Sequence, residues 1–179
     1  WYWAAKRLTL GLDELFAGQN GFFSTGSDQE DLISRPVDFM DNPLPSANSL
    51  AAEASTFLSA LTGRETPALD GIRRGAARLL ERAPHAVPHL ARVLLTRDIG
   101  IKEVAIDGEP SKRAALEHEI WSTWRPECVL ASAMNGDEHI PLLAERNTID
   151  EAATAYVCRN FVCELPVTTP QDLRDRLSD

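Results

Sequence analysis

The residues best suited to chemistry gather in one loop, residues 28–49. The acids there include Asp38 and Asp41, and two carboxylates across a pocket can serve as general acid and general base. We therefore predict that Asp38 and Asp41 carry any catalysis. The residues alone do not decide whether the chain is an enzyme.

The same loop offers further side chains for ligand contact. Carboxylates and amides match the donors and acceptors of sugar hydroxyls, and aromatic rings stack on sugar faces. Arg35 suits contact with an anion or a hydroxyl. A small hydroxylated ligand is therefore the expected small-molecule partner. The predicted ligand-binding residues are Asp28, Arg35, Asn42, Ser46 and Asn48, and Glu30, Asp31 and Ser49 lie in the same polar stretch.

A structural interpretation of these residues stays open. Asp, Asn and Ser before a helix commonly cap it or form turns. On that view Ser46 and Asn48 bond backbone amides at the start of the next helix. Arg35 would then pair with Asp38 or Asp41 and hold the loop in place.

The cysteines and histidines give weaker signals. Cys128, Cys158 and Cys163 form an odd, sparse set, which indicates reduced, buried thiols in a cytoplasmic protein rather than a disulfide framework. On a regular strand Cys158 and Cys163 point to opposite faces, so a bond between them needs a bulge. His85 and His89 share a helix face without a nearby third ligand, so we expect neither a metal nor a cofactor.

Composition narrows the class of protein. The 179 residues are 44% hydrophobic and 25% charged, which is typical of a globular chain. The net charge of −9 argues against nucleic acid and anionic membrane as main partners, because phosphate attracts Lys and Arg. No apolar run approaches the length of a membrane span.

Hydrophobic spacing predicts mainly α structure followed by a small α/β unit. Apolar residues recur at helical steps in residues 3–17, 47–61, 67–82 and after Pro84, which indicates helical hairpins in residues 1–98. In residues 99–179, short buried runs predict three strands at 102–108, 128–133 and 154–158, the last continuing towards residue 163. A helix over residues 110–124 makes the first two strands a β–α–β unit, and a final helix ends near residue 177.

Two motifs carry a resemblance to a known family. RPVD at residues 35–38 precedes DNPLPSANSLA at residues 41–51, and AYVCRNFVCELPVT spans residues 155–168. Together with GFF at residues 21–23, they resemble the carboxy-terminal end of the spermatogenesis-associated protein 20 family, also called YyaL-type thioredoxin-domain-containing proteins. The resemblance implies a thioredoxin-like domain followed by a helical toroid, similar to six-hairpin glycosidases and N-acylglucosamine 2-epimerases.

That resemblance sets the expected fold and function. Residues 1–98 would be the last hairpins of an incomplete (α/α)6-type toroid, and residues 28–49 would form part of a carbohydrate-type binding or catalytic funnel. The alternative is a structural and interaction module that supports a thioredoxin-like domain and catalyses nothing itself. The family implies no established reaction, and fold likeness does not fix function.

The first residues suggest a missing neighbour. The chain opens with Trp1, Tyr2 and Trp3 and has no initiator methionine, as in a helix whose beginning is missing. We therefore expect a carboxy-terminal fragment whose partner is the rest of a parent chain, with the missing hairpins and a thioredoxin-like domain. Trp1 and Trp3 are expected to contact another chain or, by self-association, a second copy.

Overall fold

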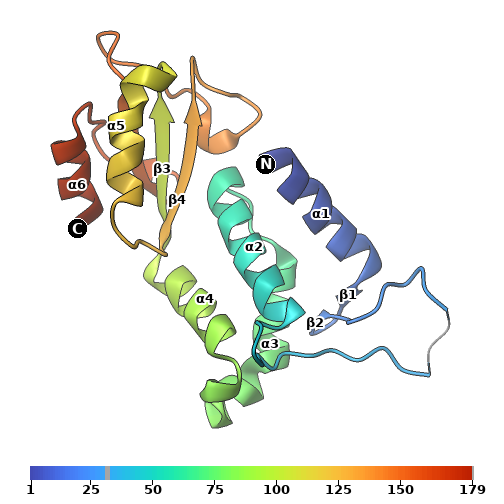
Figure 1. Ribbon diagram of the computed structural model, residues 1–179. Coiled ribbons are helices and arrows are strands. Elements are labelled where there is room, and N and C mark those ends of the chain that lie inside the picture. The colour runs from blue at the N-terminus through green and yellow to red at the C-terminus, as the bar shows by residue number, and fades with distance from the viewer. Residues whose placement is uncertain (31–32, 179) are drawn as a thin grey trace. The chain divides into compact units, whose positions relative to one another are not determined.

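A computed structural model describes residues 1–30 and 33–178. The chain forms two compact units (Figure 1). The first comprises Trp1–Ser59 and Glu65–Asp98, and the second comprises Ala60–Arg64 and the residues from Ile99 onward. Among the described residues, no helix combines the length and the apolar character needed to span a bilayer.

The amino-terminal half is built from helices and one very short hairpin. Proline stands at the first position of α3 and η1, where its missing N–H costs nothing. The elements are α1 (Tyr2–Leu15), β1 (Ala17–Gly18), β2 (Gly21–Phe22), α2 (Ala47–Thr62), α3 (Pro67–Arg82), the 3-10 helix η1 (Pro84–Ala86) and α4 (Pro88–Ile99).

The core of the first unit mixes helices, hairpin and loop. Leu69, Ile72 and Ala76 recur on one side of α3 and are buried. They pack with Phe22 of β2, and Phe39 from the long loop lies against the same cluster. By contrast, α1 contains no buried residue.

Glycines let α3 approach the hairpin closely. A Cβ on Gly75 would lie 2.1 Å from the Asn20 carbonyl oxygen and 2.4 Å from the Phe39 ring. We expect Gly75→Ala to lower the free energy of unfolding by about 2 kcal/mol, because a methyl group there overpacks the contact. Gly11→Ala is the control, since nothing lies within 4 Å of its added Cβ. In a helix interior that change should stabilise by up to about 1 kcal/mol, and equal effects of the two changes in urea unfolding would contradict the contact.

The second unit is a four-stranded mixed sheet with the order β4-β3-β5-β6. β3 and β4 are parallel and joined through α5 (Figure 1). β5 pairs antiparallel with β3 on one side and with β6 on the other. The elements are β3 (Lys102–Asp107), α5 (Pro110–Trp121), β4 (Cys128–Ala133), the 3-10 helix η2 (Pro141–Leu143), β5 (Thr154–Arg159), β6 (Val162–Cys163) and α6 (Pro170–Ser178).

The two faces of this sheet pack against different elements. Val104, Ile106 and Val157 belong to a buried cluster with Leu116 of α5 and Leu173 of α6. Side chains alternate along a strand, so Glu103 and Cys158, which are paired across β3 and β5, occupy the opposite face. The η2 segment lies against β3 and β4 with Leu142 and Leu143 buried.

The predicted helices at residues 47–61 and 67–82 and the parallel β–α–β unit are confirmed. The predicted fold class, a mainly α chain with an incomplete helical-hairpin toroid and three strands, is wrong. The fold is mixed α/β, with a four-stranded sheet and a separate two-stranded hairpin. In the first unit, α3 packs closely against β2, a contact that a toroid of paired helices does not contain.

The fourth strand arises where a continuous strand was predicted. Asn160 and Phe161 adopt φ of 51° and 63°, so they form a two-residue left-handed turn that reverses the chain. Cys158 and Cys163 thereby become directly paired across β5 and β6 and form a disulfide. The prediction of two reduced thiols is therefore wrong, because the connection is a tight turn and not a bulged strand.

Candidate functional site

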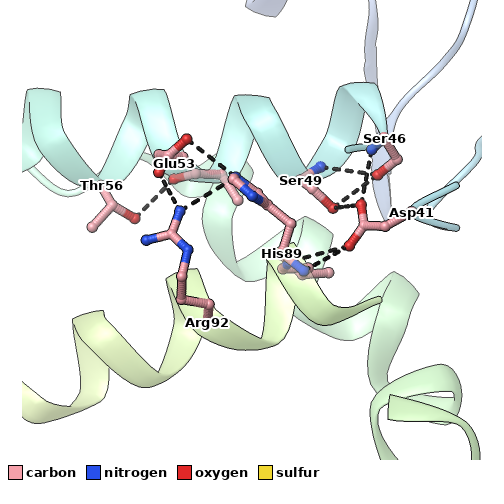
Figure 2. Close-up of polar contacts among 9 residues, drawn as sticks. Asp41, Ser46, Ser49, Glu53, Thr56, His89 and Arg92 are labelled. Atoms are coloured by element: carbon pink, nitrogen blue, oxygen red, sulfur yellow. Dashed lines mark hydrogen bonds and ion pairs between the residues drawn. The ribbon is translucent and has the colours of Figure 1, made fainter. Parts of the chain in front are cut away.

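Asp41 is the centre of the polar cluster in the predicted site (Figure 2). Its Oδ1 accepts hydrogen bonds from the Ser46 backbone N–H at 2.8 Å and from the Ser49 hydroxyl at 2.7 Å. Its Oδ2 accepts from the backbone N–H groups of His89 at 2.8 Å and Leu90 at 3.4 Å. One carboxylate thus serves the N-termini of both α2 and α4, where helix dipoles favour negative charge.

These contacts determine the protonation state of Asp41. Partial burial tends to raise the pKa of its carboxyl, but the four hydrogen bonds outweigh burial and hold the pKa below its ordinary value of 3.8. The carboxylate is therefore ionised at neutral pH, with both oxygens occupied by protein donors. A general acid needs a proton to give and a general base needs a free lone pair, and Asp41 offers neither.

Ser46 and Asn48 are buried and bond the backbone. Ser46 caps α2, since its Oγ accepts the Ser49 N–H at 3.1 Å, as the structural interpretation predicted. Asn48 does not cap the helix. Its Oδ1 accepts the Phe22 N–H at 2.7 Å, and its Nδ2 donates to the Phe22 carbonyl at 3.0 Å and to the Asp38 carbonyl at 2.8 Å. The amide therefore fastens β2 to the loop.

Arg35 also contacts backbone, and it does not pair with Asp38 or Asp41. Its guanidinium donates to the carbonyl oxygens of Thr25, at 2.5 Å, and Leu15, at 2.9 Å. It also lies 4.4 Å from the centre of the Phe23 ring. Arg35 therefore fastens the loop to residues 23–25 and to the end of α1.

The remaining predicted residues lie at the surface. Asp38 accepts the Met40 N–H at 2.9 Å in a local turn, and Asp28 accepts from the Gln29 side chain at 3.3 Å. Asn42 is exposed, and its backbone N–H donates to the Leu44 carbonyl. Asp31 lies outside the described residues. The structure thus brings Asp41, Ser46 and Asn48 to the start of α2, and it does not bring Asp28 or Asn42 there.

A second group of charges joins α2 to α4 beside this cluster (Figure 2). Glu53 of α2 accepts from His89 Nε2 at 3.1 Å and forms an ion pair with Arg92. These side chains are 21–35% exposed, so the group is partly screened by water. Sequence reasoning missed Glu53 and Arg92. The available signal was that Glu53 follows Ser49 by one helical turn and that His89 and Arg92 share a face of α4.

The two histidines predicted to share a helix face lie on different helices. His85 lies in η1, whereas His89 lies at the start of α4. Over residues 1–30 and 33–178, no group of three or more His, Cys, Asp or Glu side chains is placed to hold a metal ion.

The first unit also contains a cleft of about 300 Å³ between α1, the β1–β2 hairpin and α3. Asp13, Gln19 and Arg74 are its polar lining, and Phe22 forms part of its apolar lining. Burial raises the pKa of the Asp13 carboxyl above its ordinary value of 3.8. Within the described part of the chain, Asp13 forms no ion pair. No loop residue predicted as a ligand contact lines this cleft.

The chain is similar in sequence to part of several longer proteins. The chain is 30% identical to spermatogenesis-associated protein 20 of Rattus norvegicus and of Homo sapiens over 194 residues, which cover 99% of this chain and 24% of each relative. It is 25% identical over 174 residues to the uncharacterized protein B0495.5 of Caenorhabditis elegans, covering 91% of this chain and 23% of that protein. The chain thus spans about a quarter of these relatives' length. No protein-family model and no solved structure matches it.

Proposed function

This chain is homologous to a portion of spermatogenesis-associated protein 20, and we propose that it acts as a structural and interaction module that catalyses nothing through Asp38 or Asp41. The observation that supports this most strongly is the saturation of Asp41 by Ser46, Ser49, His89 and Leu90. A carboxylate that caps two helices holds the loop in place and has no free lone pair for a substrate. Asp38 lies in an exposed turn, and Asp41, the acid predicted to work with it, is occupied by its four donors.

The interaction surface we propose is α1. Trp1, Leu8 and Leu10 are 107%, 67% and 54% exposed, while Leu12 and Phe16 anchor the helix to the core. Large apolar side chains on one exposed helix are typical of a surface that another polypeptide covers. The occupant we propose is the remainder of a full-length protein, because the relatives hold about three quarters of their length outside the matched portion.

A chimera can test this interaction. The chain would replace the homologous portion of the Rattus norvegicus protein, and amide hydrogen exchange of α1 would be compared with exchange in the isolated chain. We expect slower exchange in the chimera and loss of that protection with Leu8→Ser and Leu10→Ser together. Leu165→Ser in the second unit is the control, since it removes a leucine that is 78% exposed. Equal exchange of α1 in both proteins would refute the proposal, and protection that appears in the isolated chain only at high concentration would assign the surface to a second copy.

A second candidate function, binding of a small hydroxylated ligand, is favoured by the cleft at Asp13, Gln19 and Arg74. Its carboxylate, amide and guanidinium match hydroxyl groups, and Phe22, Pro67 and Ala68 contribute to its apolar lining. A panel of sugars and polyols should raise the melting temperature of the chain, and Asp13→Asn should abolish the rise. Asp28→Asn is the matched control at the surface. A panel without any shift would remove this candidate and leave the interaction module unaffected.

A further inference from the structure

The disulfide of the second unit has an unusual set of neighbours. Cys158 and Cys163 face each other across β5 and β6, and Glu103 of β3 is the register partner of Cys158. Directly paired residues project from the same face of a sheet, so all three side chains share one face. Cys158 is 1% exposed and Glu103 4%, whereas Cys163 is only half-buried. Cys163 is therefore the more accessible of the two cysteines.

A guanidinium lies against the accessible sulfur. Arg146 Nη2 is 3.0 Å from Cys163 Sγ, and the guanidinium lies 5.3 Å from the centre of the Tyr156 ring. Its Nε is buried without a hydrogen-bond partner, and in the described chain no carboxylate pairs with this arginine. A disulfide sulfur is a weak acceptor, while a thiolate is an anion that would match the arginine charge.

From this geometry we infer that Cys158 and Cys163 form a reversible dithiol–disulfide couple. Cys163 is the sulfur that exchanges with an external thiol–disulfide compound, Cys158 is the resolving thiol, and Arg146 stabilises the Cys163 thiolate. This activity is separate from the proposed interaction module and uses residues of the second unit only.

The oxidative direction proceeds in two displacements. The Cys163 thiolate attacks one sulfur of a small disulfide, breaking its S–S bond, and the leaving thiolate takes up the proton that Cys163 released. Cys158 then loses its proton and attacks Sγ of Cys163, which forms the Cys158–Cys163 bond and expels the second small thiolate, which is protonated in turn. The protein dithiol loses two electrons and two protons, and the small disulfide becomes two thiols. Reduction is the reverse sequence.

Glu103 is placed to accept the proton of the buried Cys158. Desolvation raises the pKa of the Glu103 carboxyl above its ordinary value of 4.5, although backbone N–H groups of Phe161 and Asn160 act against that rise. A carboxyl with a raised pKa is a better base for a thiol in the same apolar surroundings. The Phe161 N–H donates to Glu103 Oε2 at 2.7 Å, so the same carboxylate also holds the turn that pairs the cysteines.

Cys128 provides an internal reference. It is the free cysteine of the described chain, and burial, followed by the charge of Glu127, raises the pKa of its thiol to about 11. At neutral pH it should remain protonated and react slowly. The rate difference between Cys163 and Cys128 therefore reports the local environment within one molecule.

Thiol trapping of the full chain tests the couple, with glutathione and its disulfide as the probes. In the folded chain, excess reduced glutathione should open the Cys158–Cys163 bond. Iodoacetamide should then label Cys163 on the order of 100-fold faster than Cys128 at neutral pH, since each unit of pKa is tenfold in thiolate. With Cys158→Ser, glutathione disulfide should leave one glutathione attached to Cys163.

Variants separate the two steps. Arg146→Met should slow labelling of Cys163 about tenfold, and Arg146→Lys should restore part of the rate. Arg159→Met should leave the labelling rate of Cys163 unchanged, because Arg159 lies on the other face of β5. Glu103→Gln should slow only the second step, the release of glutathione by Cys158. Circular dichroism confirms that each variant is folded. A bond that glutathione opens only after denaturation, or two thiols that persist under excess glutathione disulfide, would overturn the inference.

Discussion

Replacing Glu119 by alanine is expected to lower the free energy of unfolding by about 3 kcal/mol, the low end for a broken buried ion pair. Glu119 lies on α5 and is 5% exposed. Its oxygens accept from Arg174 of α6, from Nε at 3.0 Å and from Nη2 at 2.5 Å, and Arg125 Nη2 lies 3.6 Å away. Alanine would leave the Arg125 side chain, which is 10% exposed, without its carboxylate. The exposure of Arg174 screens the remaining pair and keeps the loss moderate.

Urea unfolding measures this loss, with Glu117→Ala as the control. Glu117 pairs with Arg113 one turn away on the same helix, and such a partly exposed pair contributes about 0.5 kcal/mol. The Arg174 contact also holds the pKa of Glu119 below its ordinary value of 4.5. A carboxyl with a lowered folded pKa stabilises above its unfolded pKa, so this contribution should disappear as pH falls below about 4. Equal losses for Glu119→Ala and Glu117→Ala would contradict the buried network.

Replacing Asp41 by alanine is expected to lower the free energy of unfolding by about 3 kcal/mol, because two helix N-termini lose their shared cap. Four donors, on Ser46, Ser49, His89 and Leu90, would lose their acceptor. Asp38→Ala is the matched control from the same predicted catalytic pair. In the described chain the Asp38 carboxylate bonds only its own turn, and alanine keeps the backbone carbonyl that Asn48 contacts, so the loss should stay within about 0.5 kcal/mol. Similar losses for the two variants would show that Asp41 is not an anchor.

Local patterns predicted most of the secondary structure. Apolar residues at helical spacing and prolines at first helical positions, such as Pro67, Pro110 and Pro170, mark helices that the structure contains. The strand, helix, strand order between residues 102 and 133 was sufficient to predict a parallel pair. These signals lie within a few residues of the elements they specify.

The failures come from contacts between distant residues. The partners of Asp41 on α4 are 48 and 49 residues away, so nothing in the sequence of the loop indicated them. The loop was therefore predicted to hold a catalytic pair, whereas Asp41 caps the N-termini of two helices. Residues 158–163 were predicted to continue one strand, because phenylalanine, the residue at position 161, rarely adopts a left-handed conformation. Glu103, 58 residues away, accepts its N–H and helps to hold that turn.

The toroid was inferred from a family resemblance, and the fold does not contain it. The homology itself stands, at 30% identity over nearly the whole chain. The resemblance therefore identified homologous proteins correctly, while the architecture expected for this portion was wrong. The predicted carbohydrate funnel depended on the toroid, so it has no structural basis in this fold.

The pH dependence of unfolding for wild type and Asp41→Asn tests the anchoring role of Asp41 most directly. The pKa of Asp41 is lowered in the folded chain, so its contribution is complete above about pH 4 and is lost as pH falls through the lowered value. Asparagine has the same shape but presents an amide N–H group to donors. We predict that Asp41→Asn is less stable at pH 7 by about 2 kcal/mol and that the two curves converge in acid. Curves that coincide at every pH would show that the Asp41 carboxylate does not anchor the two helices, and Asp41 would again be a candidate catalytic residue.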